Sequence, residues 1–115
     1  MKTSIKNELK THIIETINDQ QLDNFDELHY HAFNEDYYII GYYQADQWLK
    51  QHDVSSFDAI NTVKEYEVSN FGEMTTDINS ESIVNMYVYI LGEELLSEFD
   101  LDQDANELIE EIENS

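Results

Sequence analysis

The chain of 115 residues lacks cysteine, proline and arginine, and it has only three glycines. The absence of cysteine excludes disulfide bonds, zinc–thiolate sites and thiol catalysis. The absence of proline and the scarcity of glycine leave little turn chemistry for an all-β protein, so helices are favoured. Without arginine or a glycine-rich phosphate loop, the chain also lacks the usual means of holding a phosphate group.

Long apolar runs are missing as well. The longest fully apolar run covers residues 86–91, which is far too short to span a bilayer. The segment 1–14 has no apolar run long enough for a signal peptide. We therefore expect a soluble, cytoplasmic protein.

Positive charge is scarce along the whole chain. There are 26 acidic residues against 5 lysines, which gives a formal net charge of −21. From Glu65 onward there are 15 acidic residues and no base. A net charge of this size repels nucleic acid and anionic membranes, so we expect neither as a partner. A charged partner should be basic.

The apolar content nevertheless indicates a folded domain. Apolar residues make up 41% of the chain and aromatic residues 12%, enough for one domain with a real core over residues 1–115. Apolar positions recur at steps of three and four, as in amphipathic helices. The sequence predicts an all-α, single-domain bundle of about six helices with a highly acidic surface. The expected segments are 4–18, 25–33, 35–52, 55–71, 81–99 and a last one capped by Asp102 or Asp104.

The fourth of these segments has a clear starting signal. Ser55 and Asp58 form a pair that resembles a capping box, and a glycine follows the segment at position 72. Within the segment, Phe57, Ile60 and Val63 are spaced at three residues, so we expect them to face the core.

The third segment, 35–52, is apolar around most of its circumference. A helix of this kind is buried in a core or in an interface. We favour a central core helix, part of which serves a homodimer, because tyrosine and tryptophan are enriched at interfaces. Gly41 would then allow a neighbouring helix to approach closely. The residues expected at the dimer contact are Tyr38, Tyr42, Tyr43 and Trp48.

The last 23 residues, 93–115, contain ten acidic residues and no base. They also carry an apolar helical stripe, formed by Leu101, Ala105, Leu108 and Ile112. Four carboxylates fall on the opposite side of that helix: Asp104, Glu107, Glu110 and Glu111. Each pair of like charges at this spacing destabilises a helix by about 0.2–0.5 kcal/mol. Lysines at alternate positions would make the same pairs stabilising. The face serves either solubility or the imitation of nucleic acid.

The magnitude of the charge is compatible with imitation of DNA. Duplex DNA carries one charge per roughly 1.7 Å of axis, so 21 charges correspond to about 36 Å of duplex, near one helical turn. The residues expected to bind a basic partner are the acids of the second half, Glu65, Glu67, Glu73, Asp77, Glu81, Glu93, Glu94, Glu98, Asp100, Asp102, Asp104, Glu107, Glu110, Glu111 and Glu113.

Three short stretches resemble a known family. They are "DELH" (Asp26–His29), "YYQAD" (Tyr42–Asp46) and "ELIEEIEN" at 107–114. With the size, acidity and helical pattern, they resemble the phage-encoded DNA mimics that block restriction enzymes, the Ocr-like antirestriction proteins. The resemblance implies a stoichiometric inhibitor, without cofactor, that occupies the DNA-binding site of a basic host defence enzyme such as a restriction–modification complex. The early lysines (Lys2, Lys6 and Lys10) depart from the pattern in the first helix.

Two other interpretations stay open. One is an acidic helical interaction module without DNA mimicry. The other is a calcium loop, since Asp100, Asp102, Asp104 and Glu111 occupy its positions 1, 3, 5 and 12. However, Ala105 stands where the loop requires glycine, and only four residues follow Glu111. We therefore expect a capped helix here and no metal site.

Little in the sequence indicates catalysis. His29 and His31 point about 200° apart on a helix, so they cannot share a metal ion. His12 and His52 have no sequence partner that indicates catalysis, and adjacent carboxylates carry no information in so acidic a chain. We therefore expect that the protein is not an enzyme.

Overall fold

The computed structural model describes residues 1–34 and 41–115. The described chain is all-helical, with six helices and no strand, which confirms the predicted fold class. The helices are α1 (Thr3–Asp19), α2 (Leu28–Phe33), α3 (Tyr42–Gln51), α4 (Ser56–Phe71), α5 (Ser80–Leu96) and α6 (Ala105–Glu113). None of the helices in the described part of the chain is long and apolar enough to cross a membrane.

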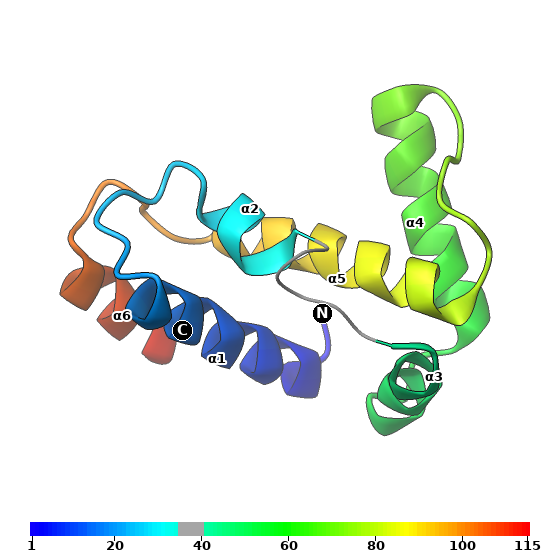
Figure 1. Ribbon diagram of the computed structural model, residues 1–115, viewed down its shortest axis with the longest axis horizontal. Helices are drawn as coiled ribbons and strands as arrows, with labels where there is room; N and C mark the ends of the chain where they lie inside the picture. The colour runs from blue at the N-terminus through cyan, green and yellow to red at the C-terminus, as the bar shows by residue number, and fades with distance from the viewer. Residues whose placement is uncertain (35–40) are drawn as a thin grey trace.

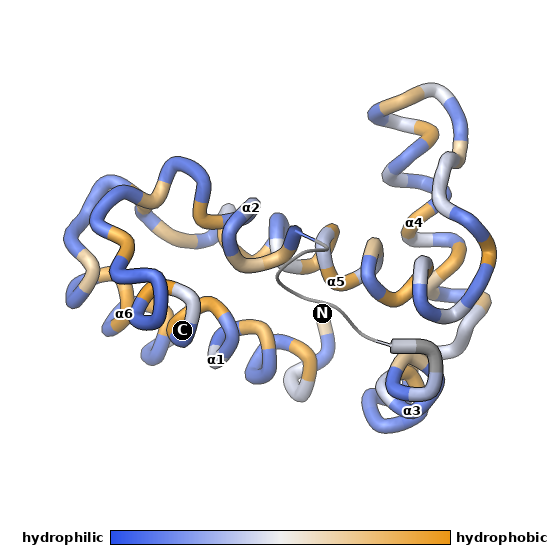
Figure 2. Tube along the Cα trace, in the orientation of Figure 1, coloured by the Kyte–Doolittle hydropathy of each residue, from blue (hydrophilic) through white to orange (hydrophobic). Residues whose placement is uncertain are grey.

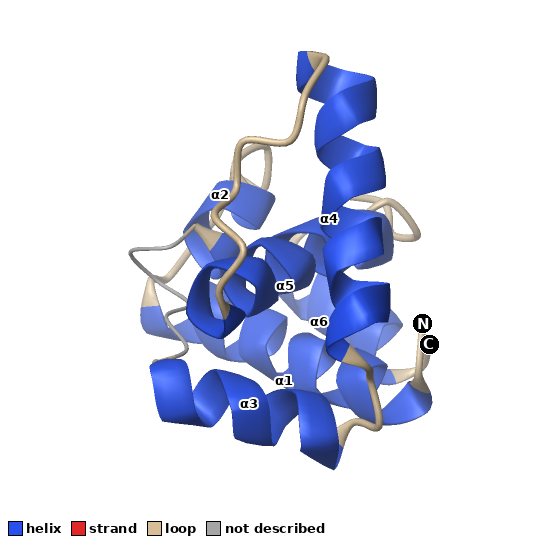
Figure 3. Ribbon diagram, turned by 90° about the vertical axis from the view of Figure 1, so that its right-hand side faces the viewer, coloured by secondary structure: helices blue, strands red, loops and turns tan. Residues whose placement is uncertain are grey.

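Helix α5 is the centre of the structure. It packs against α2, α3 and α4, while α1 packs against α2 and α6 (Figure 1). Helix α4 projects from the body at one end of α5, and the connection 72–79 returns along it (Figures 1 and 3). We call α4 together with this connection the arm. The molecule measures 39 × 31 × 23 Å along its principal axes.

The core consists of the apolar stripes that the sequence spacing predicts. In α1, the buried stripe is Ile5, Leu9, Ile13 and Ile17, and apolar residues line the inner sides of α1, α5 and α6 (Figure 2). Full burial of each such side chain contributes about 1.5–3 kcal/mol. On α6, Leu108 and Ile112 are fully buried and Ala105 is half-buried against the core, as is Leu101 in the connection before the helix.

Side-chain caps begin three of the helices. Ser55, Asn79 and Asp104 accept hydrogen bonds from the backbone N–H groups three residues later, at the starts of α4, α5 and α6. Such caps satisfy donors that have no partner within the helix. Gly72 ends α4 at φ 84°, in the left-handed region that glycine adopts without strain. Of the two caps considered for α6, the structure therefore selects Asp104.

One expectation for a buried residue was wrong. Phe57 is 71% exposed, because α4 turns Ala59, Val63 and Glu67 towards the core instead. Gly41 is the N-cap residue of α3, and among the described residues a Cβ there would meet the flexible side chain of Gln44; a helix approach at Gly41 in a dimer stays a prediction. The expected third helix also included residues 35–40, which lie outside the described residues.

The close helix approach occurs at another glycine. Gly92 of α5 lies against the Phe33 ring of α2, where an added Cβ would come within 2.6 Å of Cε2 of that ring. This glycine therefore lets α2 sit directly on the central helix.

Candidate acidic interaction surface

The acidic residues predicted to bind a partner fall into two groups, one at each end of α5. Four exposed carboxylates belong to the arm or the adjoining start of α5: Glu65, Glu73, Asp77 and Glu81. Nine belong to the opposite end, which we call the α6 end: Glu93, Glu94, Glu98, Asp100, Asp102, Asp104, Glu107, Glu110 and Glu113. Helix α5 is roughly 25 Å long, but the two groups meet at Glu93, which accepts a hydrogen bond from Tyr66 of α4.

Carboxylates at the α6 end also shape the backbone there. Asp100 accepts from the N–H of Asp102 at 2.9 Å, and Asp104 accepts from the N–H of Glu107 at 2.9 Å. Glu111 is half-buried and accepts from the side chain of Gln103. Glu111 is therefore less accessible to a partner than its exposed neighbours.

Two lysines of α1 reach this end. Lys6 lies 3.8 Å from the carboxylate of Glu98, and Lys10 donates to the backbone carbonyl of Ser115 at 3.1 Å. Exposed ion pairs of this kind contribute about 0–1 kcal/mol. The α6 end therefore remains strongly negative.

Glu67 differs from the other predicted binding residues because it is only 2% exposed. Its carboxylate accepts hydrogen bonds from the Thr75 N–H at 3.2 Å, the Thr75 hydroxyl at 2.7 Å and the Thr76 N–H at 2.9 Å. Burial raises the pKa of this carboxyl group, but the hydrogen bonds from the two threonines outweigh it and hold the pKa below its ordinary value. Glu67 therefore fixes the connection 72–79 to α4, and we correct its assignment as a contact residue.

A different polar contact joins the arm to the central helix. The Tyr66 hydroxyl donates to the carboxylate of Glu93 at 3.0 Å. Burial, together with the hydrogen bond and the negative charge of Glu93, raises the pKa of Tyr66 to about 12. Tyr66 therefore stays a neutral donor at physiological pH.

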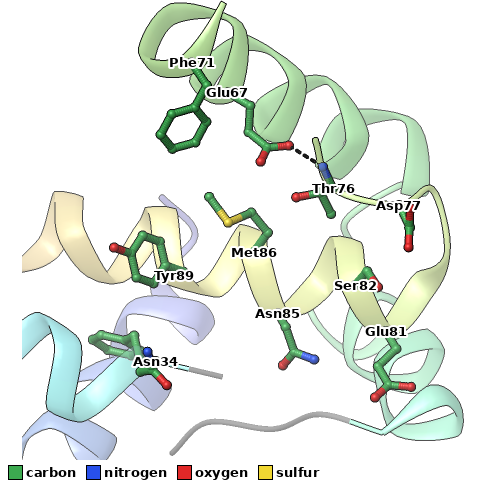
Figure 4. Close-up of a pocket in the computed structure, with 11 residues that line it drawn as sticks. Asn34, Glu67, Phe71, Thr76, Asp77, Glu81, Ser82, Asn85, Met86 and Tyr89 are labelled. Atoms are coloured by element: carbon green, nitrogen blue, oxygen red, sulfur yellow. Dashed lines mark hydrogen bonds between the residues drawn. The ribbon is translucent and has the colours of Figure 1, made fainter. Parts of the chain in front are cut away.

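A cleft of about 740 Å³ opens between the arm, α5 and the end of α2 (Figure 4). Phe71, Met86 and Tyr89 provide apolar surface, and the exposed carboxylates of Asp77 and Glu81 stand at its edge. None of the described residues that line the cleft is basic. An apolar floor with an acidic edge suits a long basic side chain, which can bury its stem and leave its charge at the rim.

The structure also revises the expected dimer contact. Trp48 is only 6% exposed, donates from Nε1 to the carboxylate of Glu8 at 2.6 Å, and contacts His52 with ring centroids 4.6 Å apart and the ring planes tilted by 57°. It is a core residue and cannot be a contact residue. Tyr43 is 79% exposed. Tyr38 and the side chain of Tyr42 lie outside the described residues.

Sequence reasoning missed the partners of His52. The ring is 5% exposed; its Nδ1 lies 2.8 Å from the Ser4 hydroxyl and its Nε2 lies 3.7 Å from the carboxylate of Glu8. Serine, histidine and glutamate are also the components of hydrolytic triads. Here the ring of His52 is buried, and the carboxylate of Glu8 already accepts a hydrogen bond from Trp48. The contacts among the three side chains join the start of α1 to the end of α3.

The other histidines contact backbone carbonyls or a nearby carboxylate. His12 and His29 contact the carbonyl oxygens of Ala32 and Tyr89 through Nε2. His31 lies 4.0 Å from Glu27. Within residues 1–34 and 41–115, no group of three or more histidines or carboxylates is placed to hold a metal ion. In the proposed calcium loop, residues 105–111 belong to helix α6 instead.

Comparison with protein-family models, with curated proteins and with solved structures finds no match to this chain. The similarity to antirestriction proteins therefore stays a prediction from the sequence.

Proposed function

We propose that the protein is a non-catalytic inhibitor that imitates DNA and occupies the DNA-binding site of a basic bacterial defence enzyme, such as a restriction–modification complex. The observation that carries this proposal is the α6 end, where nine exposed carboxylates gather in a half of the chain without a single base. The resemblance of the short sequence stretches to phage DNA mimics names the class of target.

The dimensions support the same proposal. The net charge of −21 corresponds to roughly 36 Å of duplex at about 1.7 Å per charge. The longest axis of the molecule is 39 Å. The protein thus carries about the charge of a DNA segment of its own length. A channel that binds one turn of duplex would meet a similar charge over a similar distance.

A second candidate function is an acidic interaction module without DNA mimicry. The cleft beside the arm favours it, because Phe71, Met86 and Tyr89 offer an apolar floor for one basic side chain. Duplex DNA presents no such feature. A partner that inserts a basic side chain into this cleft would bind the protein whether or not it also binds DNA.

The first experiment captures proteins from a bacterial lysate on the immobilised chain and elutes them with duplex DNA. Under the mimicry proposal, DNA-binding proteins are retained and the duplex displaces them. Retention of partners that DNA does not displace supports the interaction module instead.

The second experiment measures how salt changes the affinity of a captured partner for the native chain and for charge-reversed variants of the chain. Binding should weaken steeply between low and high salt, because screening removes charge–charge attraction. Reversal of Glu107 and Glu110 to lysine at the α6 end should weaken binding strongly. The matched control reverses the exposed Asp53 and Asp58 near the α3–α4 junction, with the same change in net charge. Equal losses in both variants would assign the effect to net charge alone, and binding that is flat in salt would refute mimicry.

A further inference from the structure

The cleft beside the arm joins an apolar part to an acidic part. Phe71, at the end of α4, lies opposite Met86 and Tyr89 of α5 (Figure 4). The exposed carboxylates of Asp77 and Glu81 stand near the start of α5. Met86 and Glu81 are five residues apart, or about 7.5 Å along the helix axis. A long basic side chain spans this distance with its stem on the apolar part and its charge at the acidic part.

The two carboxylates at the edge have no other partner in the described part of the chain. Neither Asp77 nor Glu81 makes a side-chain hydrogen bond or an ion pair there. Glu67 also lines the cleft, but its carboxylate already accepts three hydrogen bonds from Thr75 and Thr76. The charge of a bound ligand is therefore left to Asp77 and Glu81.

The hydrogen bonds between Glu67 and the two threonines, which we call the Glu67 latch, also shape the cleft. Phe71 stands one helical turn after Glu67 on α4, and Asp77 directly follows Thr76. The latch therefore fixes the apolar wall and one of the edge carboxylates relative to each other. If the connection 72–79 separated from α4, Asp77 would leave the cleft with it.

We propose that the cleft binds a lysine or arginine side chain of a partner protein, and that this binding and the closed Glu67 latch stabilise each other. The proposal rests on the interaction module, the second candidate function above, and assigns the residues that hold the partner. A neutral side chain would leave the acidic part of the cleft without a partner, and an acidic one would meet a chain of net charge −21. Because coupling between two events is reciprocal, a ligand that needs the closed latch also holds it closed.

The first test observes the methyl group of Met86 by NMR, in the full chain with ¹³C-labelled methionine methyl groups. The ligands are lysine and arginine, each acetylated at the α-amino group and amidated at the carboxyl group. Both should shift the Met86 signal saturably. At equal salt, the same derivative of norleucine has the stem without the charge, and methylammonium has the charge without the stem, so neither should do so. The signal of Met1, which does not line the cleft, should stay in place.

A pair of charge variants tests the acidic part. Asp77→Asn combined with Glu81→Gln should weaken binding of the lysine derivative by about three- to tenfold, since each exposed ion pair contributes modestly. The matched control is Glu65→Gln combined with Glu73→Gln. It removes the same charge from exposed positions of the arm that do not line the cleft, so its effect should be much smaller.

A pair of phenylalanine variants tests the apolar part. Phe71→Ala should weaken binding of the lysine derivative by about threefold, because the stem loses one wall of the cleft. Phe57→Ala removes another exposed phenylalanine of α4, one that does not line the cleft, and should leave binding unchanged. Circular dichroism should show the native helical fold in both variants.

Hydrogen exchange of the Thr76 amide tests the coupling to the latch, because this amide donates to Glu67. A ligand present at about ten times its dissociation constant slows opening that destroys its site by about tenfold. The lysine derivative should therefore slow exchange at Thr76 by up to about this factor, and the norleucine derivative should not. Glu67→Gln should weaken binding of the lysine derivative although Glu67 does not touch it.

Three results overturn the binding site: a Met86 signal that neither basic derivative shifts, an equal response to the norleucine derivative, or equal losses in the two pairs of charge variants. Exchange at Thr76 that the lysine derivative leaves unchanged overturns the coupling. These measurements contain neither DNA nor a DNA-binding protein. Their failure would leave the proposed inhibitory function untouched, and failure of DNA to displace captured proteins would leave this site standing.

Discussion

Replacement of Glu67 by glutamine should loosen the arm. The change keeps the size of a side chain that is only 2% exposed, but it removes the charge that the Thr75 and Thr76 donors face. The amide retains one acceptor oxygen and brings an NH₂ group towards donors. The oxygen can keep the two N–H donors, and the NH₂ group can bond the Thr75 hydroxyl only if that bond reverses, so all three contacts lose the contribution of the carboxylate charge.

The expected cost follows from those contacts. A hydrogen bond to a charged group contributes about 1.5–3 kcal/mol net. Thr75 is exposed, so water can replace part of what it loses. We therefore expect Glu67→Gln to lower the free energy of unfolding by about 1–2 kcal/mol at neutral pH. For a domain of about this size, that lowers the melting temperature by about 4–8 °C.

The loss should depend on pH with a definite sign. The pKa of Glu67 is lower in the folded state than its ordinary value, so the folded protein favours the ionised carboxylate. Its contribution is fully present above the ordinary pKa of glutamate, about 4.3, and disappears as the pH falls through the lowered value. The difference in stability between the native chain and Glu67→Gln should therefore be constant near neutral pH and shrink in acid.

Urea unfolding of both proteins at neutral and acid pH measures this difference. Glu65→Gln, at an exposed position on the same helix, is the matched control and should change stability by less than about 0.5 kcal/mol. Hydrogen exchange of the Thr75 and Thr76 amides reports the local contact, and both should exchange faster in Glu67→Gln. A difference that is the same at neutral and acid pH, or no faster exchange, would refute the assigned role.

Two further predictions concern packing and metal. Gly92→Ala should lower the free energy of unfolding by about 1–3 kcal/mol, because the new Cβ overlaps the Phe33 ring. Gly41→Ala, where the flexible Gln44 is the one described side chain that must move, should have a much smaller effect, and equal melting temperatures for the two variants would contradict this packing. Calcium should raise the melting temperature no more than magnesium does, since residues 105–111 are helical. A calcium-specific rise that Asp100→Ala removes would restore the calcium interpretation.

The buried stripes of the helices could be predicted from the sequence, because a helix with one buried face repeats its apolar residues at a fixed spacing. Their ends could not: α2 begins at Leu28 rather than at residue 25, and α5 ends at Leu96 rather than at residue 99. Ile5, Leu9, Ile13 and Ile17 are an example, and all are buried. Caps are equally local signals: the spacing of Ser55 to Asp58 predicts the start of α4, whereas the sequence leaves Asp102 and Asp104 as alternative caps of α6 and the structure selects Asp104.

The errors arose where a residue depends on a distant partner or where a helix has two apolar faces. In α4, the spacing of Phe57 fits a buried stripe, but Ala59 and Val63 form the side that α5 covers. Glu67 looked like another surface carboxylate because its donors come from a connection whose path the sequence does not show. Trp48 was assigned to an interface because its partner Glu8 lies 40 residues away.

The pairing of α1 with α6 has a consequence for synthesis. The apolar face of α1 is covered by α2 and α6, and 94 residues separate Asp19, where α1 ends, from Glu113, where α6 ends. At roughly 5–20 residues per second, a ribosome needs about 5–19 seconds to make that stretch. During this time part of the α1 face has no cover, and neighbouring nascent chains could associate through it. Each growing chain gains negative charge as its second half emerges. Neighbouring nascent chains then repel one another, and this repulsion opposes their association through the uncovered face of α1.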